Sequence, residues 1–526
     1  MKNSKLIFLT STCLLALSGC NFISASTIDN SENTSNTTSQ TTSEQPNSSN
    51  TTTSQNTSSE NPGDETVIKN SQEYLNFWNP STKLALDIQM SSQAAEFINQ
   101  YQSNHDDSTY HDYYVPCKVV LTINGKSTTY DEVGIRQKGN MSRTNMLDNG
   151  NFSLNSLAHY KLSFKETFDG DEYSDIDALT PFKKIWTDSA AKKERKNRRL
   201  FDMEKIDIKW NRNDDETKSK QAYTLKMFRD NGVMAGHDTL AETSLSVTGK
   251  SPVKTTYEIL ECIDSVFVKR HFGESDADGD LYKCAYTGMG PANFTKYTVG
   301  KEVGVEDNTK NYHPIYDLKT NKKKNTTHQS LLDFIAVVND KTSSASAFKE
   351  KLEKTFDIKS FMMYESIAYL AGNFDDFRNN ANNYYLYITN TTKKTYFIPY
   401  DFDRCFGAGC EGRKDYMTNF SPESTKMQCS GNWQTINLYW RTICTSSSQN
   451  NIERVEEYRA MYQKNIEDLL NNSTISDNSF TSYVNSFPSN YRGNPNGAGN
   501  ENTTFSNYLS KKISAIKSNC PNYNIK

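Results

Sequence analysis

Carboxylate and amide side chains gather in two short segments, 373–383 and 401–403. The candidate site residues among them are Asp375, Asp376, Asn380, Asn383, Asp401 and Asp403. The apolar runs 384–388 and 395–399 between the segments read as two strands and predict a hairpin, which would bring both segments to one end. Oxygen ligands suit Mg²⁺ or Mn²⁺, and Mg²⁺ takes one or two carboxylates and completes its shell with water and phosphate. The pattern therefore indicates metal-assisted phosphoryl transfer.

Phosphoryl transfer also requires an acid that orients or deprotonates the attacking hydroxyl group. In protein kinases this Asp precedes a metal-binding Asn by five positions, and the interval from Asp375 to Asn380 is the same. Two other interpretations use the same kinds of residue. Acidic and Asn-rich loops commonly form turns and helix caps. Asp401-Phe402-Asp403 also fits the Asp-x-Asp that holds a metal and a sugar nucleotide in glycosyltransferases.

The surrounding sequence predicts the elements that hold these segments. Apolar alternation and turn residues indicate strands at 117–123 and 127–136, joined across Asn124-Gly125, and at 160–164, 241–248 and 256–261. Apolar residues at helical spacing predict helices at 214–231, 264–271, 330–338, 358–371 and 453–470. The expected fold class is α+β, with a strand-rich first lobe and a helical second lobe that carries one hairpin.

Several blocks of sequence resemble a known family in the same order. They are GIRQKGNMSR, HYKLSFK, YEILECIDSVFVKRHFG, GDLYKCAY, GNFDDFRNNANNYYLYI and KKTYFIPYDFDRCFG. Together they cover roughly residues 115–470, and they are similar to the spore-coat protein H (CotH) kinase family. The resemblance implies an atypical protein-kinase-like fold of two lobes, with a strand-rich N-lobe and a mainly helical C-lobe, that phosphorylates proteins with ATP and a divalent metal.

The resemblance also implies roles for the acidic hairpin. Asp375 would be the catalytic base, with Asp376 as the less favoured candidate. Asp401 would be the principal metal ligand, with Asp403 nearby. The assisting metal ligand would be Asn380 or Asn383.

In the N-lobe the resemblance implies a phosphate-binding lysine on a strand. Lys161 is the first candidate, Arg136 and Lys138 are its rivals, and the turn 139–143 would cover phosphates with backbone N–H groups. Glu216, in the expected helix 214–231, would hold the lysine, although an acid in a first helical turn is also explained by the helix dipole. Glu261 would face the adenine or pair with Lys283, and a buried structural ion pair is the alternative.

The amino terminus has the pattern of an exported lipoprotein. A basic start and an apolar run to Leu17 precede Leu17-Ser18-Gly19-Cys20, which is similar to the bacterial lipoprotein signal and implies a diacylglycerol on Cys20. Residues 21–66 are mostly Ser, Thr, Asn, Gln and Glu and predict a disordered tether. The expected location is the outer face of the cell membrane. Beyond the tether, residues 67–471 form the predicted kinase-like domain, and 472–526 form a C-terminal extension.

Composition narrows the partners. The formal net charge of −4 and the lack of a dense Lys/Arg face argue against nucleic acid as a partner.

After processing, an even set of cysteines remains, which permits disulfides outside the cell, such as Cys405–Cys410 or Cys429–Cys444. Free buried thiols are the alternative.

The sequence thus predicts an ATP-dependent protein kinase at the cell surface. Its protein substrates would lie within reach of the anchor and include the Ser/Thr-rich tether itself. Two other classes remain open, a surface adhesin or matrix-binding pseudokinase and a metal-dependent glycosyltransferase-like enzyme.

Overall fold

The computed structural model describes residues 70–526, apart from 105–111, 141, 212–213, 274, 296, 410–418, 425–435 and 445–451. Cys20, the signal peptide and the predicted tether 21–66 lie outside the described residues, as do Cys410 and Cys429. All of the described residues belong to one unit of the chain, residues 61–526.

The first part of this unit is a closed barrel of seven strands, in the order β1-β2-β3-β6-β7-β9-β8. The strands are β1 (Leu84–Met90), β2 (Val115–Ile123), β3 (Lys126–Gln137), β6 (Tyr160–Ser163), β7 (Lys205–Lys209), β8 (Asp238–Val247) and β9 (Val253–Glu261). Buried residues alternate along β1, as expected for a strand with one face on the core. The predicted β2–β3 hairpin is confirmed, and its turn residues Asn124 and Gly125 both have positive φ, as a tight hairpin turn requires.

Short elements connect the barrel strands. They are α1 (Gln72–Trp78), α2 (Ser92–Tyr101), β4 (Leu147–Asp148), β5 (Asn151–Phe152), α3 (Glu172–Asp175), η1 (Thr180–Phe182), α4 (Ser189–Asn197) and α5 (Lys220–Asp230). The sequence predicted α5 from residue 214, but it begins at Lys220. The reason is Asp215, whose carboxylate accepts hydrogen bonds from the backbone N–H groups of Thr217, Ser219 and Lys220 and so fixes a turn before the helix.

The second part contains a five-stranded sheet in the order β11-β12-β10-β13-β14. Its strands are β10 (Asp280–Cys284), β11 (Val303–Gly304), β12 (Tyr316–Leu318), β13 (Tyr384–Ile388) and β14 (Thr395–Pro399). The predicted hairpin is confirmed, since β13 and β14 pair antiparallel with Tyr384 opposite Pro399. It is not isolated, however, because β13 also pairs with β10.

Helices complete the second part. They are α6 (Ser265–His271), η2 (Asn308–Lys310), α7 (Gln329–Val338), α8 (Ala345–Thr355), α9 (Ile358–Ala371), α10 (Phe377–Asn380), α12 (Asn437–Thr442), α13 (Glu456–Asn471), α14 (Asp477–Ser486) and α15 (Phe505–Asn519). The predicted bounds of α9 are confirmed. Residues beyond 471 join the core of this part, since Phe480 and Phe505 belong to the same hydrophobic cluster as the buried residues of α9. Their rings stack at 4.1 Å between centroids, and both also contact Tyr223 of α5.

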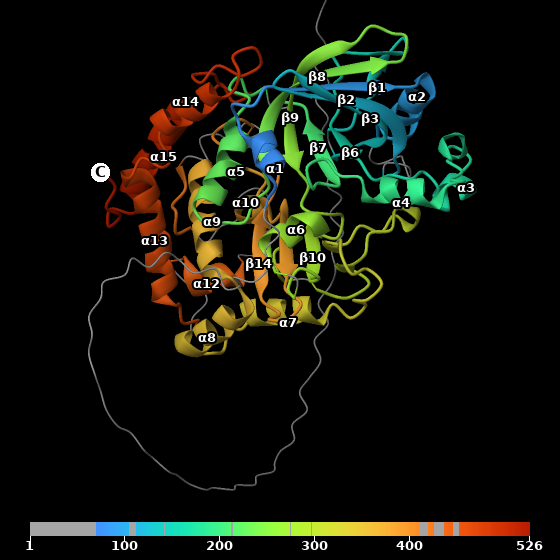
Figure 1. Ribbon diagram of the computed structural model, residues 1–526. Coiled ribbons are helices and arrows are strands. Elements are labelled where there is room, and N and C mark those ends of the chain that lie inside the picture. The colour runs from blue at the N-terminus through green and yellow to red at the C-terminus, as the bar shows by residue number, and fades with distance from the viewer. Residues whose placement is uncertain are drawn as a thin grey trace, which may run out of the picture. The chain divides into compact units, whose positions relative to one another are not determined.

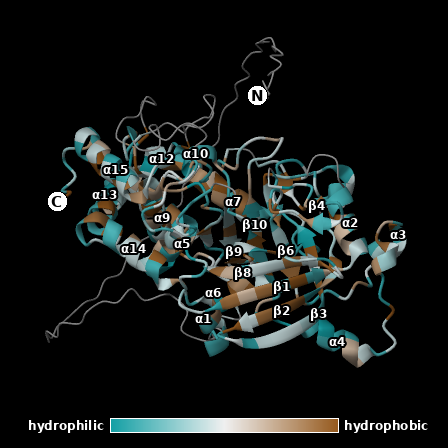
Figure 2. Cartoon of the chain, turned by 90° about the horizontal axis from the view of Figure 1, so that it is seen from above, coloured by the Kyte–Doolittle hydropathy of each residue, from teal (hydrophilic) through white to brown (hydrophobic). Residues whose placement is uncertain are grey.

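Each part has its own large hydrophobic core. In both views the barrel strands lie at one end and α9, α13 and α15 at the other (Figures 1 and 2). The mixed α+β class is therefore confirmed, and the strand-rich first part closes into a barrel. Within the described residues, no helix has the length and apolar character needed to cross a membrane.

The described cysteines are free thiols. They are Cys117, Cys262, Cys284, Cys405, Cys444 and Cys520. All six are buried, so the alternative of buried free thiols holds for these residues.

Candidate functional site

The two acidic segments lie side by side, as the hairpin predicted. Helix α9 ends at Gly372, whose φ of 61° turns the chain into the first segment. The second segment follows β14 directly. The side-chain amide of Asn373 donates to the backbone carbonyl of Asp401 at 3.2 Å, which joins the two segments.

Asp375 is held by three amide groups. Its carboxylate accepts hydrogen bonds from the side chains of Asn380 at 2.5 Å, Asn382 at 3.1 Å and Asn383 at 3.0 Å. Burial raises the pKa of Asp375, while the bonds from Asn380 and Asn382 act against that shift. The amides thus fix the carboxylate in one orientation, and both predicted metal-assisting residues contact the predicted base.

Asp376 has a different environment from its neighbour. It is fully buried and caps α10, since its carboxylate accepts from the backbone N–H of Asn379 at 2.8 Å. Burial raises the pKa of Asp376 to about 8. Of the two candidate bases, Asp376 therefore caps a helix. Asp375 is the one whose carboxylate is oriented by amide groups.

Asp401 and Asp403 converge on one cation, the ammonium group of Lys209. Lys209 Nζ forms a salt bridge with Asp401 and lies 2.9 Å from Asp403 Oδ2. Although burial opposes its ionisation, Lys209 and then Lys138 lower the pKa of Asp401. The same carboxylates raise the pKa of the buried Lys209. Residues almost 200 positions apart, on β7 and after β14, therefore meet at the centre of the site.

Lys209 is a functional candidate that sequence reasoning missed. It lies on β7, for which no strand was predicted. The sequence Lys205-Ile206-Asp207-Ile208-Lys209 alternates polar and apolar residues, which is the period of a strand, and it lies shortly before a predicted helix. That alternation was the available signal.

The predicted phosphate-binding lysines, Lys161 and Lys138, both face one acid. Asp207, on β7, forms salt bridges with Lys138 at 2.8 Å and with Lys161 at 3.2 Å, and it accepts a hydrogen bond from Tyr400 at 3.2 Å. Despite burial, Lys138 and Lys161 hold the pKa of Asp207 far below its usual range. Arg136, the third candidate, forms a salt bridge with Asp112 at 3.1 Å.

Two predicted contacts are not present. Glu216 precedes α5 rather than lying in it, and its carboxylate accepts from the backbone N–H of Ala498 at 3.2 Å. It therefore does not hold Lys161. Glu261 pairs with Arg270 at 2.6 Å and not with Lys283, and it also accepts from the Tyr74 hydroxyl at 2.8 Å. The alternative of a buried structural ion pair describes Glu261.

The donor set fits a divalent cation of the Mg²⁺ type. Among the described residues, no group of three or more His, Cys, Asp or Glu side chains is placed to hold a metal without help. Asp401 and Asp403 nevertheless converge on a single positive charge, that of Lys209. Mg²⁺ requires only one or two protein carboxylates when phosphate and water supply the other ligands.

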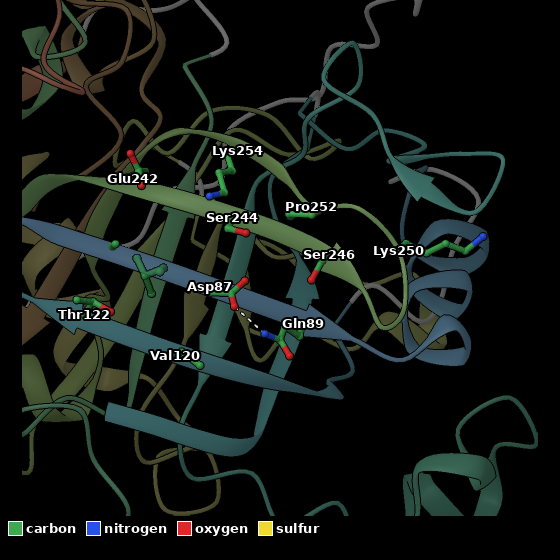
Figure 3. A pocket seen from close by; sticks show the side chains of 12 residues that line it. Asp87, Gln89, Val120, Thr122, Glu242, Ser244, Ser246, Lys250, Pro252 and Lys254 are labelled. Atoms are coloured by element: carbon green, nitrogen blue, oxygen red, sulfur yellow. Dashed lines mark hydrogen bonds between the residues drawn. The ribbon is translucent and has the colours of Figure 1, made fainter. Parts of the chain in front are cut away.

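A polar hollow lies away from this site, on the outer face of β1, β2 and β8 (Figure 3). Its volume is about 420 Å³. Asp87, Thr122, Glu242 and Ser244 point into it from the strands, and Gln89 donates to Asp87 at 2.6 Å. Lys250 and Lys254 also line this polar surface.

Among the comparisons with known proteins, a family model shows the family of this chain. A crystal structure of the Helicobacter pylori proinflammatory kinase CtkA is similar at 11% identity, with a TM-score of 0.29, covering 60% of this chain and 88% of that one. No curated protein matches the sequence. The CotH kinase protein family model matches residues 135–511, which include β7 and both acidic segments. The chain therefore belongs to the CotH kinase protein family.

Proposed function

We propose that this protein is a kinase that transfers the γ-phosphate of ATP to Ser or Thr hydroxyl groups of other proteins, with Mg²⁺ or Mn²⁺. One observation carries the proposal: Lys209 contacts Asp401 and Asp403 beside an amide-held Asp375. Protein kinases combine a strand lysine, a metal-binding Asp and an Asp that accepts the proton of the substrate hydroxyl group. These residues supply all three kinds of group.

The order of the elements supports a two-lobed kinase arrangement. In protein kinases the phosphate-binding lysine lies on the strand that precedes a helix of the first lobe. Here β7 carries Lys209 and α5 is the next helix. In this proposal the barrel is the first lobe, the five-stranded sheet with its helices is the second, and residues 262–264 after β9 connect them.

In the proposed phosphoryl transfer each of these residues has a defined role. Asp375 accepts the proton of the attacking hydroxyl group, and its amide bonds with Asn380 and Asn383 keep its carboxylate oriented. Lys209 supplies positive charge for the phosphates. Asp401 and Asp403 would hold the metal ion, which would supply positive charge to the transferred phosphoryl group.

The proposed location is the outer face of the cell membrane, anchored through a lipid on Cys20. The lipoprotein pattern of the first residues supports it. An anchored enzyme on a tether of about 45 residues, with an rms reach of roughly 35–40 Å, would modify nearby surface proteins. Its own Ser/Thr-rich residues 21–66 are the first candidates.

The test uses protein that lacks residues 1–66, which retains α1 and its Ser71 cap. With ATP and Mg²⁺ or Mn²⁺ it should phosphorylate itself or a Ser/Thr-rich protein. Asp401→Ala should abolish this activity. Asp468→Ala, the same change at an exposed position on α13, should not. Equal, negligible phosphate incorporation by the wild type and Asp401→Ala would refute the proposal.

A second candidate is a surface adhesin or matrix-binding pseudokinase. The wide polar hollow on β1, β2 and β8 favours it, because that hollow is larger than the space beside Lys209. Substituting Asp87 and Glu242 with Lys would then reduce attachment to a surface partner while leaving phosphate transfer unchanged. Unchanged attachment in this double variant would count against the adhesin.

A further inference from the structure

A buried pair of acids lies near Lys209, on the barrel strands β8 and β9. Asp238 of β8 and Glu258 of β9 are both almost fully buried. Burial raises the pKa of both carboxyl groups, and Asp238 raises the pKa of Glu258 further. Two acids placed together in a protein interior are costly unless they are hydrogen-bonded or paired with a positive charge. The groups that contact Asp238 and Glu258 therefore decide how the fold tolerates this pair.

Gln221 of α5 connects this acid pair to Lys209. Its side-chain amide NH₂ donates to Glu258 at 2.7 Å and to Asp238 at 3.2 Å. Its amide oxygen accepts from Lys209 Nζ at 3.0 Å. The Gln221 side chain thus donates to two carboxyl groups and accepts from one ammonium group. Only an amide, which carries both donors and an acceptor, satisfies all three contacts.

Protein kinases have a different residue at the comparable place in the fold. They place a Glu on the helix after the lysine strand, and its charge pairs directly with the lysine. Here that helix offers a neutral amide, which connects Lys209 to the carboxyl groups of Asp238 and Glu258 on the barrel strands. Resting on the kinase function proposed above, we propose that Gln221 is a positioning residue that holds Lys209 for the nucleotide phosphates, with Glu258 as the hydrogen-bond partner that fixes its amide.

A charge exchange tests the arrangement. Gln221→Glu alone places a third carboxyl group beside Glu258 and Asp238, so the midpoint of thermal unfolding should fall. Adding Glu258→Gln should restore it, because the pair keeps one hydrogen bond with donor and acceptor exchanged, and Lys209 keeps an acceptor. A double variant that is no more stable than Gln221→Glu would contradict the proposed partnership with Glu258.

The positioning role of Gln221 is tested with Gln221→Leu, which removes all three hydrogen bonds. The dissociation constant for ATP, measured by calorimetry, should rise about 10- to 100-fold, the effect of one hydrogen bond to a charged group, with KM for ATP rising in parallel. Gln221→Glu/Glu258→Gln should bind ATP within about threefold of the wild type. The matched control is Tyr223→Phe on the same helix, whose hydroxyl contacts Ser479 and Thr474 instead. If Gln221→Leu binds ATP as tightly as Tyr223→Phe does, Gln221 is only a packing residue.

A third measurement separates this inference from the proposed function. The rate at which an amine reagent labels Lys209, followed by mass spectrometry, should be higher in Gln221→Leu than in the wild type and Tyr223→Phe. If the wild type transfers no phosphate, the kinase proposal fails, yet the labelling still reports whether Gln221 holds Lys209. Equal labelling in all three proteins would overturn the inference even if the enzyme is active.

Discussion

Lys209 Nζ lies 2.9 Å from Asp403 Oδ2, which joins the barrel to the segment after β14. The contact matters because both side chains are charged and the lysine is almost fully buried. A buried ammonium group needs a counter-charge, and the acidic segment supplies it. The barrel and the acidic segment are therefore held together by charged residues of the candidate site itself.

The first prediction concerns Lys209 itself. Lys209→Met should reduce phosphate transfer by about 10²–10³-fold, the usual cost of removing one preorganised group that stabilises charge in a transition state. Rates with saturating ATP provide the measurement. Lys192→Met, at a more exposed lysine on α4, is the control. Equal rates in the two variants would remove Lys209 from the mechanism.

The second prediction separates two adjacent acids. Asp375→Asn should lower the rate constant by about 10²–10⁴-fold, as expected when a general base is lost, without changing the midpoint of thermal unfolding by much. Asp376→Asn should leave the rate nearly unchanged, since Asp376 caps α10 and has its pKa raised to about 8. The reverse order of effects would assign the base to Asp376.

The third prediction is the pH dependence of stability at Asp376. Its folded pKa of about 8 lies above the ordinary value of 3.8, so the folded state holds this proton more tightly than the unfolded state. The free energy of unfolding should therefore lose a contribution as pH rises from about 4 to 8. Chemical denaturation across that range should show a shallower fall for Asp376→Asn. Parallel curves for both proteins would mean that Asp376 is ionised when folded.

The fourth prediction concerns the buried pair at the end of β9. Arg270→Met leaves Glu261 buried without its cation and should cost about 3–5 kcal/mol of stability. Tyr74→Phe removes only the second bond to the same carboxylate and should cost about 1–3 kcal/mol. Urea denaturation measures both. A smaller loss for Arg270→Met than for Tyr74→Phe would show that Glu261 is already protonated in the fold.

Local patterns predicted much of the fold. The turn at Asn124-Gly125, the helix 358–371 and the hairpin after Asn383 all follow from residues close together in sequence, and the structure confirms them. Asp375 and its amides follow for the same reason. The barrel closure between β1 and β8 does not, because it pairs parallel strands separated by about 150 positions, and no local signal specifies such a pairing.

The lysine was missed for a physical reason as well. Lys161 on β6 and Lys209 on β7 both occupy short strands in which polar and apolar residues alternate. The choice between them depends on which strand lies beside Asp401, a long-range contact. Likewise, Glu216 was placed in a helix that begins later, because Asp215 binds the backbone N–H groups that precede α5.

The most direct test of the kinase proposal is transfer of isotope label from ATP to the chain that lacks residues 1–66, with Mg²⁺ or Mn²⁺. ATP labelled at the γ-phosphate should label Ser or Thr residues of the wild type and of Asp468→Ala, but not of Asp401→Ala. ATP labelled at the α-phosphate should leave no label. Label from the α-phosphate, or equal γ-label in the wild type and Asp401→Ala, would contradict the proposal.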